Sequence, residues 1–246
     1  MKIKALRRVG CAVLAAILLC LSCPVGSAEE TTASEDTAVN VLPFQTTSRY
    51  DMGLDPTNVR LGWEIETGIR GFYQSAYRVV MTETATSATA WDSGWVESSA
   101  QIGICPEGLK PETIYTYAVT VKDQNGREYT TATPATLETA PAKLESEWLA
   151  SKGLLRETFT LEQPLANVER ARCYMSSSGI IEVRLNGQKV GDLIWNPKKA
   201  VSDLVTYYNT YDITDMLLDG ANAVGAYTGL EANGGCALNG DRKSVV

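Results

Sequence analysis

The chain has 246 residues, of which 44% are hydrophobic and 21% charged. This composition is typical of a globular protein of one or two domains and argues against a disordered or collagen-like chain. The sequence contains no histidine. Because no other side chain has an ordinary pKa near neutrality, this absence excludes the Ser-His-Asp triad, the Cys-His pair and every histidine-ligated metal site.

The first 28 residues have the pattern of a secretory signal peptide. Four basic residues within Met1–Arg8 precede an uncharged stretch, Val9–Ala28, which ends in small residues suited to signal peptidase. The apolar part of this stretch is shorter than the ~20 residues that a membrane-spanning helix needs. We therefore predict a secreted or cell-surface protein without a stable membrane span, cleaved after Ala28. A lipoprotein that begins at Cys23 is the alternative.

The charge balance is acidic. Loss of the signal segment would leave 18 basic against 29 acidic residues, a net charge of −11. Because a phosphate backbone is bound through a basic surface, we predict no nucleic-acid partner.

The cysteines do not indicate a disulfide framework. Three of the six lie in the predicted signal segment, and the others, Cys105, Cys173 and Cys236, are an odd number at unrelated spacings. This pattern also argues against a cysteine-only metal site. No glycine-rich phosphate-binding pattern occurs. We predict no cofactor and no metal ion, and assign the three cysteines to packing.

A tether and a first β-sandwich are expected after the signal segment. Residues 29–46 are expected to form a flexible tether, because Glu29–Asn40 is rich in Thr, Ala, Ser and acidic residues. Apolar and polar residues then alternate over Val59–Ile65 and Tyr77–Met81, with the period of a half-buried strand. These strands predict a β-sandwich over residues 47–140, closed by a proline-containing linker.

The segment Leu109–Val121 resembles the fibronectin type III signature, in which a Leu and a Pro end one strand and a Tyr begins the next. In this motif, a tyrosine corner, the Tyr hydroxyl bonds back to the corner backbone. The following Asp123–Gly126 predicts a hairpin turn, because Asn-Gly tolerates positive φ at both central positions.

A second sandwich is predicted over residues 141–240. Alternation recurs over Leu155–Leu161 and Ile181–Leu185. The pair Asn186-Gly187 then predicts a hairpin turn after the second of these strands.

One short helical turn is expected at Thr214–Leu218, with Asp212 or Thr214 as its N-cap and Gly220 as its C-terminal stop. No segment has the spacing of an amphipathic helix of about ten residues or more. The predicted fold class is therefore all-β: a fibronectin type III-like sandwich followed by an incomplete jelly-roll-like β-sandwich.

Several motifs follow one another along the chain: Leu54–Trp63, Arg70–Val79, Trp91–Gly94, Leu185–Asp192, Tyr208–Thr214 and Leu217–Val224. Their order resembles the N-terminal region of bacterial α-L-rhamnosidases, which are glycoside hydrolases. The resemblance implies two non-catalytic modules ahead of a helical (α/α)6 catalytic barrel, and so no catalytic residue within this chain. It also implies an inverting parent enzyme, in which two carboxyl groups stand far enough apart to admit a water molecule.

The function expected from this resemblance is that of accessory modules of a secreted α-L-rhamnosidase, which hydrolyses terminal α-L-rhamnose from glycosides or polysaccharides. The partner would be a rhamnose-containing glycan, bound through the catalytic domain, and the chain alone would be inactive. A stand-alone secreted carbohydrate-binding or adhesion module is the alternative. Residues 241–246 resemble the translation of a common sequencing adapter, so we expect a non-native tail there. We also expect an incomplete second sandwich that is poorly stable.

Five residues could form an aromatic platform for a sugar ring: Trp195, Asn196, Tyr207, Tyr208 and Tyr211. Core and edge packing in strands is the interpretation that we favour for them.

Two carboxylates, Asp212 and Asp215, lie three residues apart in the sequence, a spacing that could suggest a paired acid and base. A helix cap and a solvated surface acid explain them better, because no neighbouring group in the sequence would separate their pKa values.

Overall fold

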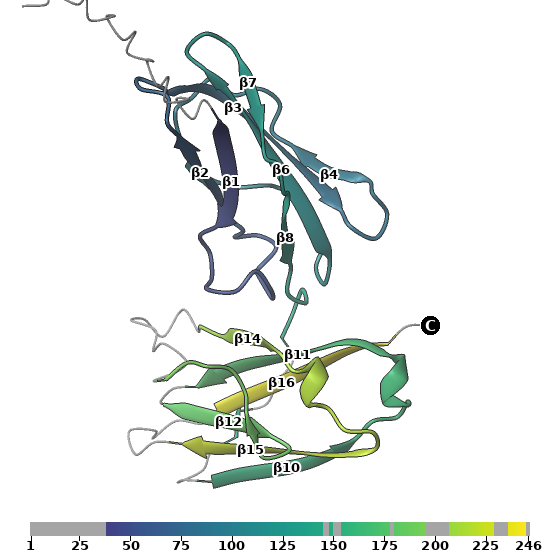
Figure 1. Cartoon of the computed structure of the whole chain (residues 1–246). Helices are drawn as coiled ribbons and strands as arrows, with labels where there is room; N and C mark the ends of the chain where they lie inside the picture. Colours follow the sequence, from purple (N-terminus) through teal and green to yellow (C-terminus); the bar gives the residue numbers. More distant parts are fainter. Residues whose placement is uncertain are drawn as a thin grey trace, which may run out of the picture. The chain divides into compact units, whose positions relative to one another are not determined.

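The computed structural model describes residues 38–144, 148–149, 154–177, 180–194, 207–228 and 236–244. Within these ranges the regular structure consists of β-strands and two short 3-10 turns. The strands form antiparallel sheets that build one sandwich from each predicted domain (Figure 1). The all-β class expected from the alternation is confirmed.

The first sandwich has a three-stranded and a five-stranded sheet. The smaller sheet has the order β1 (Val39–Gln45), β2 (Leu61–Thr67), β5 (Ile102–Ile104). The larger sheet has the order β4 (Thr89–Asp92), β3 (Gln74–Glu83), β6 (Ile114–Asp123), β7 (Glu128–Thr130), and β8 (Ala135–Glu138) also pairs with β6.

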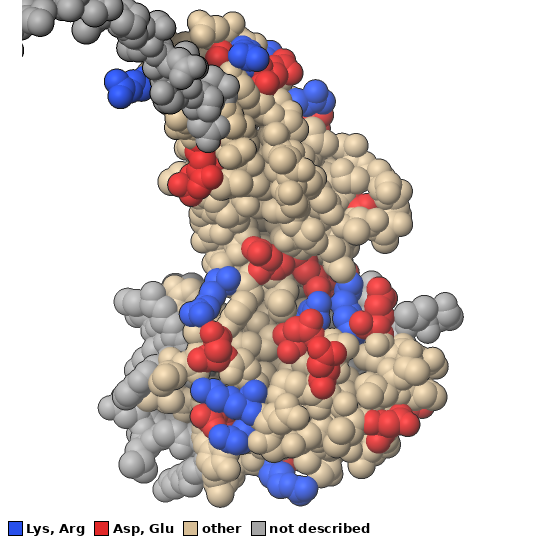
Figure 2. Space-filling view, in the orientation of Figure 1, with Lys and Arg blue, Asp and Glu red and all other residues tan. Residues whose placement is uncertain are grey.

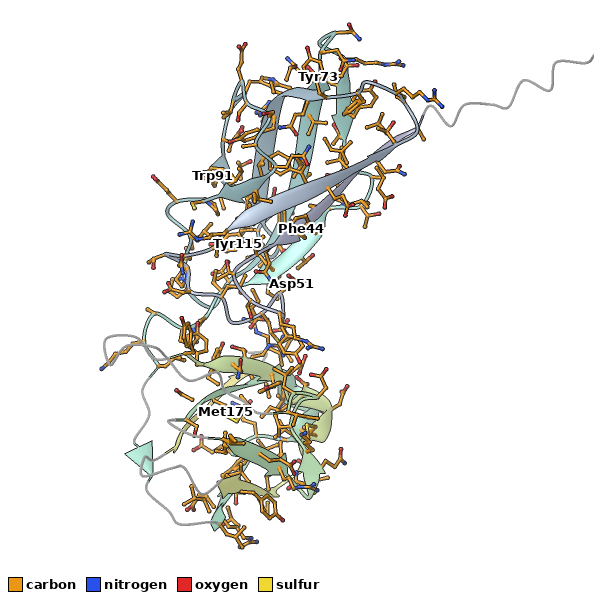
Figure 3. The ribbon with its side chains drawn as sticks, turned by 90° about the vertical axis from the view of Figure 1, so that its left-hand side faces the viewer. Phe44, Asp51, Tyr73, Trp91, Tyr115 and Met175 are labelled. Atoms are coloured by element: carbon orange, nitrogen blue, oxygen red, sulfur yellow. The ribbon has the colours of Figure 1, made fainter. Side chains whose placement is uncertain are left out.

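The core between these two sheets is aromatic. Alternation along β2 and β6 turns Trp63, Tyr115 and Tyr117 inward, and each is at most 2% exposed. Figure 3 labels Tyr115 within this sandwich. The indole N–H of Trp63 donates a hydrogen bond to the Gln74 side-chain oxygen at 2.8 Å. The one polar atom of this large side chain is thereby satisfied inside the core.

The strand β1 lies inside the range 29–46, which the sequence assigns to a tether. It pairs with β2 along its whole length, and Val41 is buried in the core. The sandwich thus begins earlier than residue 47. Pro43 interrupts the strand signal of the sequence, yet it is compatible with β1 because this strand is at the edge of its sheet.

The tyrosine corner forms as expected. The backbone N–H of Lys110 donates a hydrogen bond to the Tyr115 hydroxyl at 2.7 Å. The hairpin turn after β6 also forms, but only Gly126 has positive φ there, at 78°. The Asp123 side chain accepts a hydrogen bond from the Asn125 backbone N–H at 2.8 Å. The predicted hairpin turn is therefore present, with one left-handed residue instead of the two that Asn-Gly tolerates.

The second sandwich has two four-stranded sheets. One has the order β10 (Leu154–Thr160), β15 (Ala221–Thr228), β12 (Ile181–Leu185), β13 (Gln188–Lys189). The other has the order β14 (Asn209–Asp212), β11 (Val168–Ser177), β16 (Cys236–Ser244), β9 (Trp148–Leu149). The 3-10 turns are η1 (Leu165–Asn167) and η2 (Thr214–Met216).

The turn between β12 and β13 has the geometry that its sequence predicts. Asn186 has a φ of 51° and Gly187 a φ of 83°, so both central residues are left-handed. The Asn186 side chain donates to Asn222 at 2.8 Å, and Asn222 is only 2% exposed. Asn222 is thus one of the buried polar residues of the second sandwich, and its amide is paired with that of Asn186.

The turn η2 lies within the expected Thr214–Leu218. The Asp212 carboxylate accepts a hydrogen bond from the Thr214 backbone N–H at 3.0 Å. The turn ends at Met216 with Leu217 as its C-cap, so Gly220 is not its C-terminal stop, contrary to the prediction. Gly220 has a φ of 75°, which favours glycine in the loop before β15.

Candidate functional site

Four charged residues from the two sandwiches form one ion-pair cluster, which we call the joint cluster: Glu138, Arg170, Arg172 and Asp212. Glu138 ends β8, both arginines lie in β11, and Asp212 ends β14. Arg172 Nη2 lies 2.8 Å from Glu138 Oε2, and its Nη1 lies 2.8 Å from Asp212 Oδ2. Arg170 Nε lies 3.7 Å from the other oxygen of Glu138.

The centre of the joint cluster is shielded from water. The side chains of Glu138 and Arg172 are 8% and 11% exposed. Burial lowers the pKa of Arg172, but the hydrogen bond to Glu138 and the charges of Glu138 and Asp212 raise it overall. Desolvation offsets much of the attraction in a buried pair, yet removal of one partner leaves an uncompensated charge. Loss of either Glu138 or Arg172 would therefore leave the other charge buried without its main partner.

Other contacts also join the two sandwiches. The Tyr208 hydroxyl donates a hydrogen bond to the Gly53 carbonyl at 2.8 Å. Gly53 has a φ of 63° and lies so close to Thr210 that a Cβ at position 53 would overlap its side chain. Arg49 forms an ion pair with Asp192 at 2.9 Å.

A groove lies on the outward face of the sheet formed by β10, β15 and β12, and we call it the sheet groove. Its floor is formed by Gly225 and Ala223 in β15. The strand register places Arg156 in β10 and Arg184 in β12 on either side of Gly225. The small floor residues leave a cavity of about 260 Å³, and Tyr227, 53% exposed, lines it.

Strand alternation explains why these side chains face outward. In β12, Val183 and Leu185 are buried in the second core, so Glu182 and Arg184 point to the opposite face. In β15, Ala226 is buried in the same core, while Tyr227 next to it is exposed. The sheet groove is thus on the solvent side of its sheet.

The described side chains around the sheet groove carry a net positive charge. Arg184 Nε donates a hydrogen bond to Glu182 Oε1 at 2.9 Å, and Lys189 in β13 lies 3.7 Å from the other oxygen of Glu182. The Arg184 guanidinium also lies 5.8 Å from the ring centre of Tyr227. Arg156, on the opposite side of Gly225 from Arg184, adds a third basic residue to this face. In Figure 2, basic side chains lie over the region where Figure 1 draws β12 and β10.

The three described residues of the aromatic platform that the sequence could suggest lie in different surroundings. Tyr211 is 5% exposed and belongs to the second core. Tyr208 packs against Tyr174, with a ring-centre distance of 6.1 Å. Tyr207 is exposed, and Trp195 and Asn196 lie outside the described residues. Packing is the correct interpretation for Tyr208 and Tyr211.

Asp212 and Asp215, the two carboxylates that lie three residues apart in the sequence, have different surroundings. Asp215 is exposed in η2. Asp212 accepts hydrogen bonds from Thr214 and pairs with Arg172. Burial raises the pKa of Asp212, but its hydrogen bonds to Thr214 and the charge of Arg172 outweigh this effect and lower it. The prediction that Asp212 or Thr214 is the N-cap of η2 was wrong: the N-cap is Ile213, and Asp212 holds Thr214 from one residue earlier. The ion pair with Arg172 was not predictable from the sequence.

The described part of the chain contains no group of His, Cys, Asp and Glu side chains arranged to hold a metal ion. Of the two cysteines with described side chains, Cys105 is exposed and Cys173 is buried. Burial raises the pKa of the Cys173 thiol to about 12, which makes it a packing residue with little nucleophilic character. Over the described ranges, no helix has the length and apolar composition needed to cross a membrane.

Both sandwiches match known domain families. Residues 46–143 match the family described as Rha78A-like, N-terminal immunoglobulin domain. Residues 166–239 match the α-L-rhamnosidase N-terminal domain. Immunoglobulin and fibronectin type III domains share the sandwich architecture, which explains the resemblance of the Leu109–Val121 segment to the latter. The chain is thus an immunoglobulin-type domain followed by a second β-sandwich domain of the α-L-rhamnosidase N-terminal type.

Curated relatives point to the same family. An α-L-rhamnosidase of Formosa agariphila is 30% identical over 205 residues, which cover 68% of this chain and 21% of that protein. An α-L-rhamnosidase of Streptomyces avermitilis is 31% identical over 119 residues, which cover 45% of this chain and 12% of that protein. The chain corresponds to the N-terminal region of α-L-rhamnosidases. It spans about a fifth or less of the length of these relatives.

Solved structures share the fold. The α-L-rhamnosidase from Dictyoglumus thermophilum aligns with a TM-score of 0.69 at 20% identity, over 84% of this chain and 27% of that one. The enzyme from Aspergillus terreus aligns with a TM-score of 0.60 at 21% identity, over 82% of this chain and 27% of that one.

Proposed function

We propose that this chain is the N-terminal accessory region of a secreted α-L-rhamnosidase. The observation that carries the proposal is the ordered match of both sandwiches to the N-terminal domains of that family. In this proposal the substrate is a glycoside or polysaccharide with terminal α-L-rhamnose, which is hydrolysed by a catalytic domain outside the described sandwiches. The acidic net charge supports a partner other than nucleic acid.

The role that we propose for the two sandwiches is to support and position the catalytic domain. The joint cluster supports this role, because Glu138 of the first sandwich and Arg172 of the second form a buried ion pair. A buried charge that loses its partner is costly, so this contact opposes separation of the two sandwiches.

Activity measurements test this proposal. The reading frame is followed in genomic DNA beyond codon 240, and the longer product and the 246-residue chain are both assayed with p-nitrophenyl α-L-rhamnopyranoside. We expect the longer product to release rhamnose with inversion at the anomeric carbon, seen by NMR, and the 246-residue chain to be inactive. Rhamnose release at enzymatic speed by the 246-residue chain, or a genuine stop codon without a catalytic domain, would contradict the proposal. The stop codon would favour a stand-alone binding or adhesion module.

We further propose export, with cleavage after Ala28. The charged start and apolar stretch of the first 28 residues support it. Mass spectrometry of the protein produced in its natural host is expected to give a mature start at Glu29. A lipid-modified start at Cys23 would indicate the lipoprotein alternative instead, and a cytoplasmic protein that retains Met1 would contradict export.

A further inference from the structure

The sheet groove combines three properties on one face of the second sandwich. It is hollow, because Gly225 and Ala223 leave its floor without large side chains. It is basic, although the chain as a whole has a net charge of −7. It is lined by an exposed aromatic ring, that of Tyr227.

We propose that the sheet groove binds an anionic sugar residue, a pyranose that carries a carboxylate or a sulfate. The anionic group would lie between Arg156 and Arg184, and the sugar ring would lie against Tyr227. That the anionic ligand is a saccharide, and not another anion, rests on the proposed function.

The two arginines supply the charge complementarity. They belong to β10 and β12, the two neighbours of β15, so their backbones are separated by roughly 9.5 Å, twice the strand spacing. An anion above Gly225 is within reach of both side chains. A guanidinium presents paired N–H groups that match the oxygens of a carboxylate or sulfate.

Arg184 is already held in position. Its Nε–H donates to Glu182 at 2.9 Å, and its Nη1 donates to the Gly187 carbonyl at 3.1 Å. A side chain fixed before binding loses less conformational entropy when the ligand arrives. Because Glu182 is also close to Lys189, its negative charge is shared between two basic groups, which leaves Arg156 to balance a ligand.

The aromatic and apolar residues fit a sugar ring. Tyr227 is 53% exposed and Leu154, its register partner on β10, is 70% exposed. The C–H faces of a pyranose pack against such surfaces. The cavity volume of about 260 Å³ is slightly below the usual range of small-molecule pockets. It suits one or two sugar residues better than a large ligand.

Isothermal titration calorimetry of the 246-residue chain tests the proposal with three oligosaccharides of equal length: an oligogalacturonate, a sulfated galactan oligosaccharide and a neutral galactan oligosaccharide. We expect a dissociation constant of about 1 mM for at least one anionic probe. Its affinity is expected to fall with added salt, and the neutral probe is expected to bind at least fivefold more weakly. The two anionic probes distinguish a carboxylate ligand from a sulfate ligand.

Variants locate the binding. Arg156→Met and Tyr227→Ala are each expected to weaken binding of the anionic probe at least fivefold, and Arg156→Lys less than Arg156→Met, because lysine keeps the charge without the paired N–H groups. Arg78→Met is the matched control, since Arg78 is a half-exposed arginine on a strand of the first sandwich. It is expected to bind like the parent chain. Thermal unfolding of each variant checks that it is folded.

Three results would overturn the proposal: equal binding of the neutral and anionic probes, unchanged affinity in both Arg156→Met and Tyr227→Ala, or no binding of any probe. The last result is expected if a protein domain covers this face. These outcomes are independent of the rhamnosidase assay, because they concern binding by the 246-residue chain alone. If no probe binds in the titration, the proposed rhamnosidase activity is unaffected. If the longer product is inactive, binding of an anionic probe by the 246-residue chain is unaffected.

Discussion

The two sandwiches share an all-β architecture but bury different side chains. Nearly all of the largest, almost completely buried side chains among the described residues belong to the first sandwich, including Trp63, Tyr115 and Tyr117. The second sandwich contributes Met175, which Figure 3 labels. Its core otherwise consists mainly of aliphatic residues together with Tyr211, and the buried amide of Asn222 lies beside it.

The two sandwiches thus use different interactions to stabilise the same kind of fold. In the first, a few aromatic side chains account for much of the apolar area removed from water. In the second, Asn222 hydrogen-bonds to Asn186, to Leu218 and to Gly220, so it fixes the turn between β12 and β13 against the loop before β15. The first sandwich should therefore respond most to loss of volume, and the second to loss of a hydrogen-bonding group.

The largest effect is expected from Trp63→Ala. Removal of this buried side chain should cost about 3–5 kcal/mol of unfolding free energy, because it creates a large cavity. Urea unfolding followed by far-ultraviolet circular dichroism measures the loss. Trp95→Ala is the control, since Trp95 is 40% exposed and should lose less than Trp63→Ala does. Equal losses in the two variants would contradict the aromatic-core account.

The next effect concerns the joint cluster. Arg172→Met should destabilise the chain by about 3 kcal/mol, because Glu138 then remains buried without its main partner. The double variant Arg172→Met with Glu138→Leu should recover most of this loss, because it removes both charges. Urea midpoints of the single and double variants measure the coupling. A double variant that is as unstable as Arg172→Met would show that the ion pair is not the cause.

A smaller loss is expected from Asn222→Ala in the second sandwich. The substitution leaves the backbone groups of Leu218 and Gly220 without their side-chain partner, which should cost about 1–3 kcal/mol. Hydrogen exchange of the Leu218 amide would report the loosening directly. The exposed Asn40→Ala is the control and should change stability by less than about 0.5 kcal/mol. If both variants behaved alike, the amide network would have no special role.

The smallest effect is a pH dependence in the first sandwich. Hydrogen bonds from Arg78 and from the Gly94 backbone lower the pKa of Asp92 from 3.8 to about 2. Because the folded pKa lies below the unfolded one, this contribution to stability is present above pH 3.8 and is lost as the pH falls towards 2. NMR titration of the Asp92 carboxyl measures the pKa directly. A value near 3.8 in the folded chain would refute the pairing with Arg78.

The sequence was sufficient for features that depend on neighbouring residues. Strand alternation, the tyrosine corner at Tyr115 and the left-handed turn at Asn186 each arise from local backbone and side-chain preferences. The joint cluster was not predictable, since Glu138 and Arg172 are 34 residues apart and meet only in the folded chain. Their charge would also suggest exposure, because charged residues are rarely buried without a partner.

The sheet groove was missed for a related reason. Small residues such as Gly225 weaken the strand signal of a sequence, and nothing in the sequence says which neighbours flank them. The register of β10, β15 and β12 supplies that information by placing an arginine on each side. A cavity of this kind is a property of the sheet and not of any one strand.

The absence of a side chain at Gly53 has a consequence for how these two domains can diverge. A single methyl group added at position 53 would collide with Thr210. Even an uncharged substitution there would therefore push the two domains apart. Amino-acid substitution at position 53 is thus constrained by the neighbouring domain as well as by the backbone φ of 63° at Gly53. Covariation of this position with Thr210 in related chains would record that steric coupling over evolutionary time.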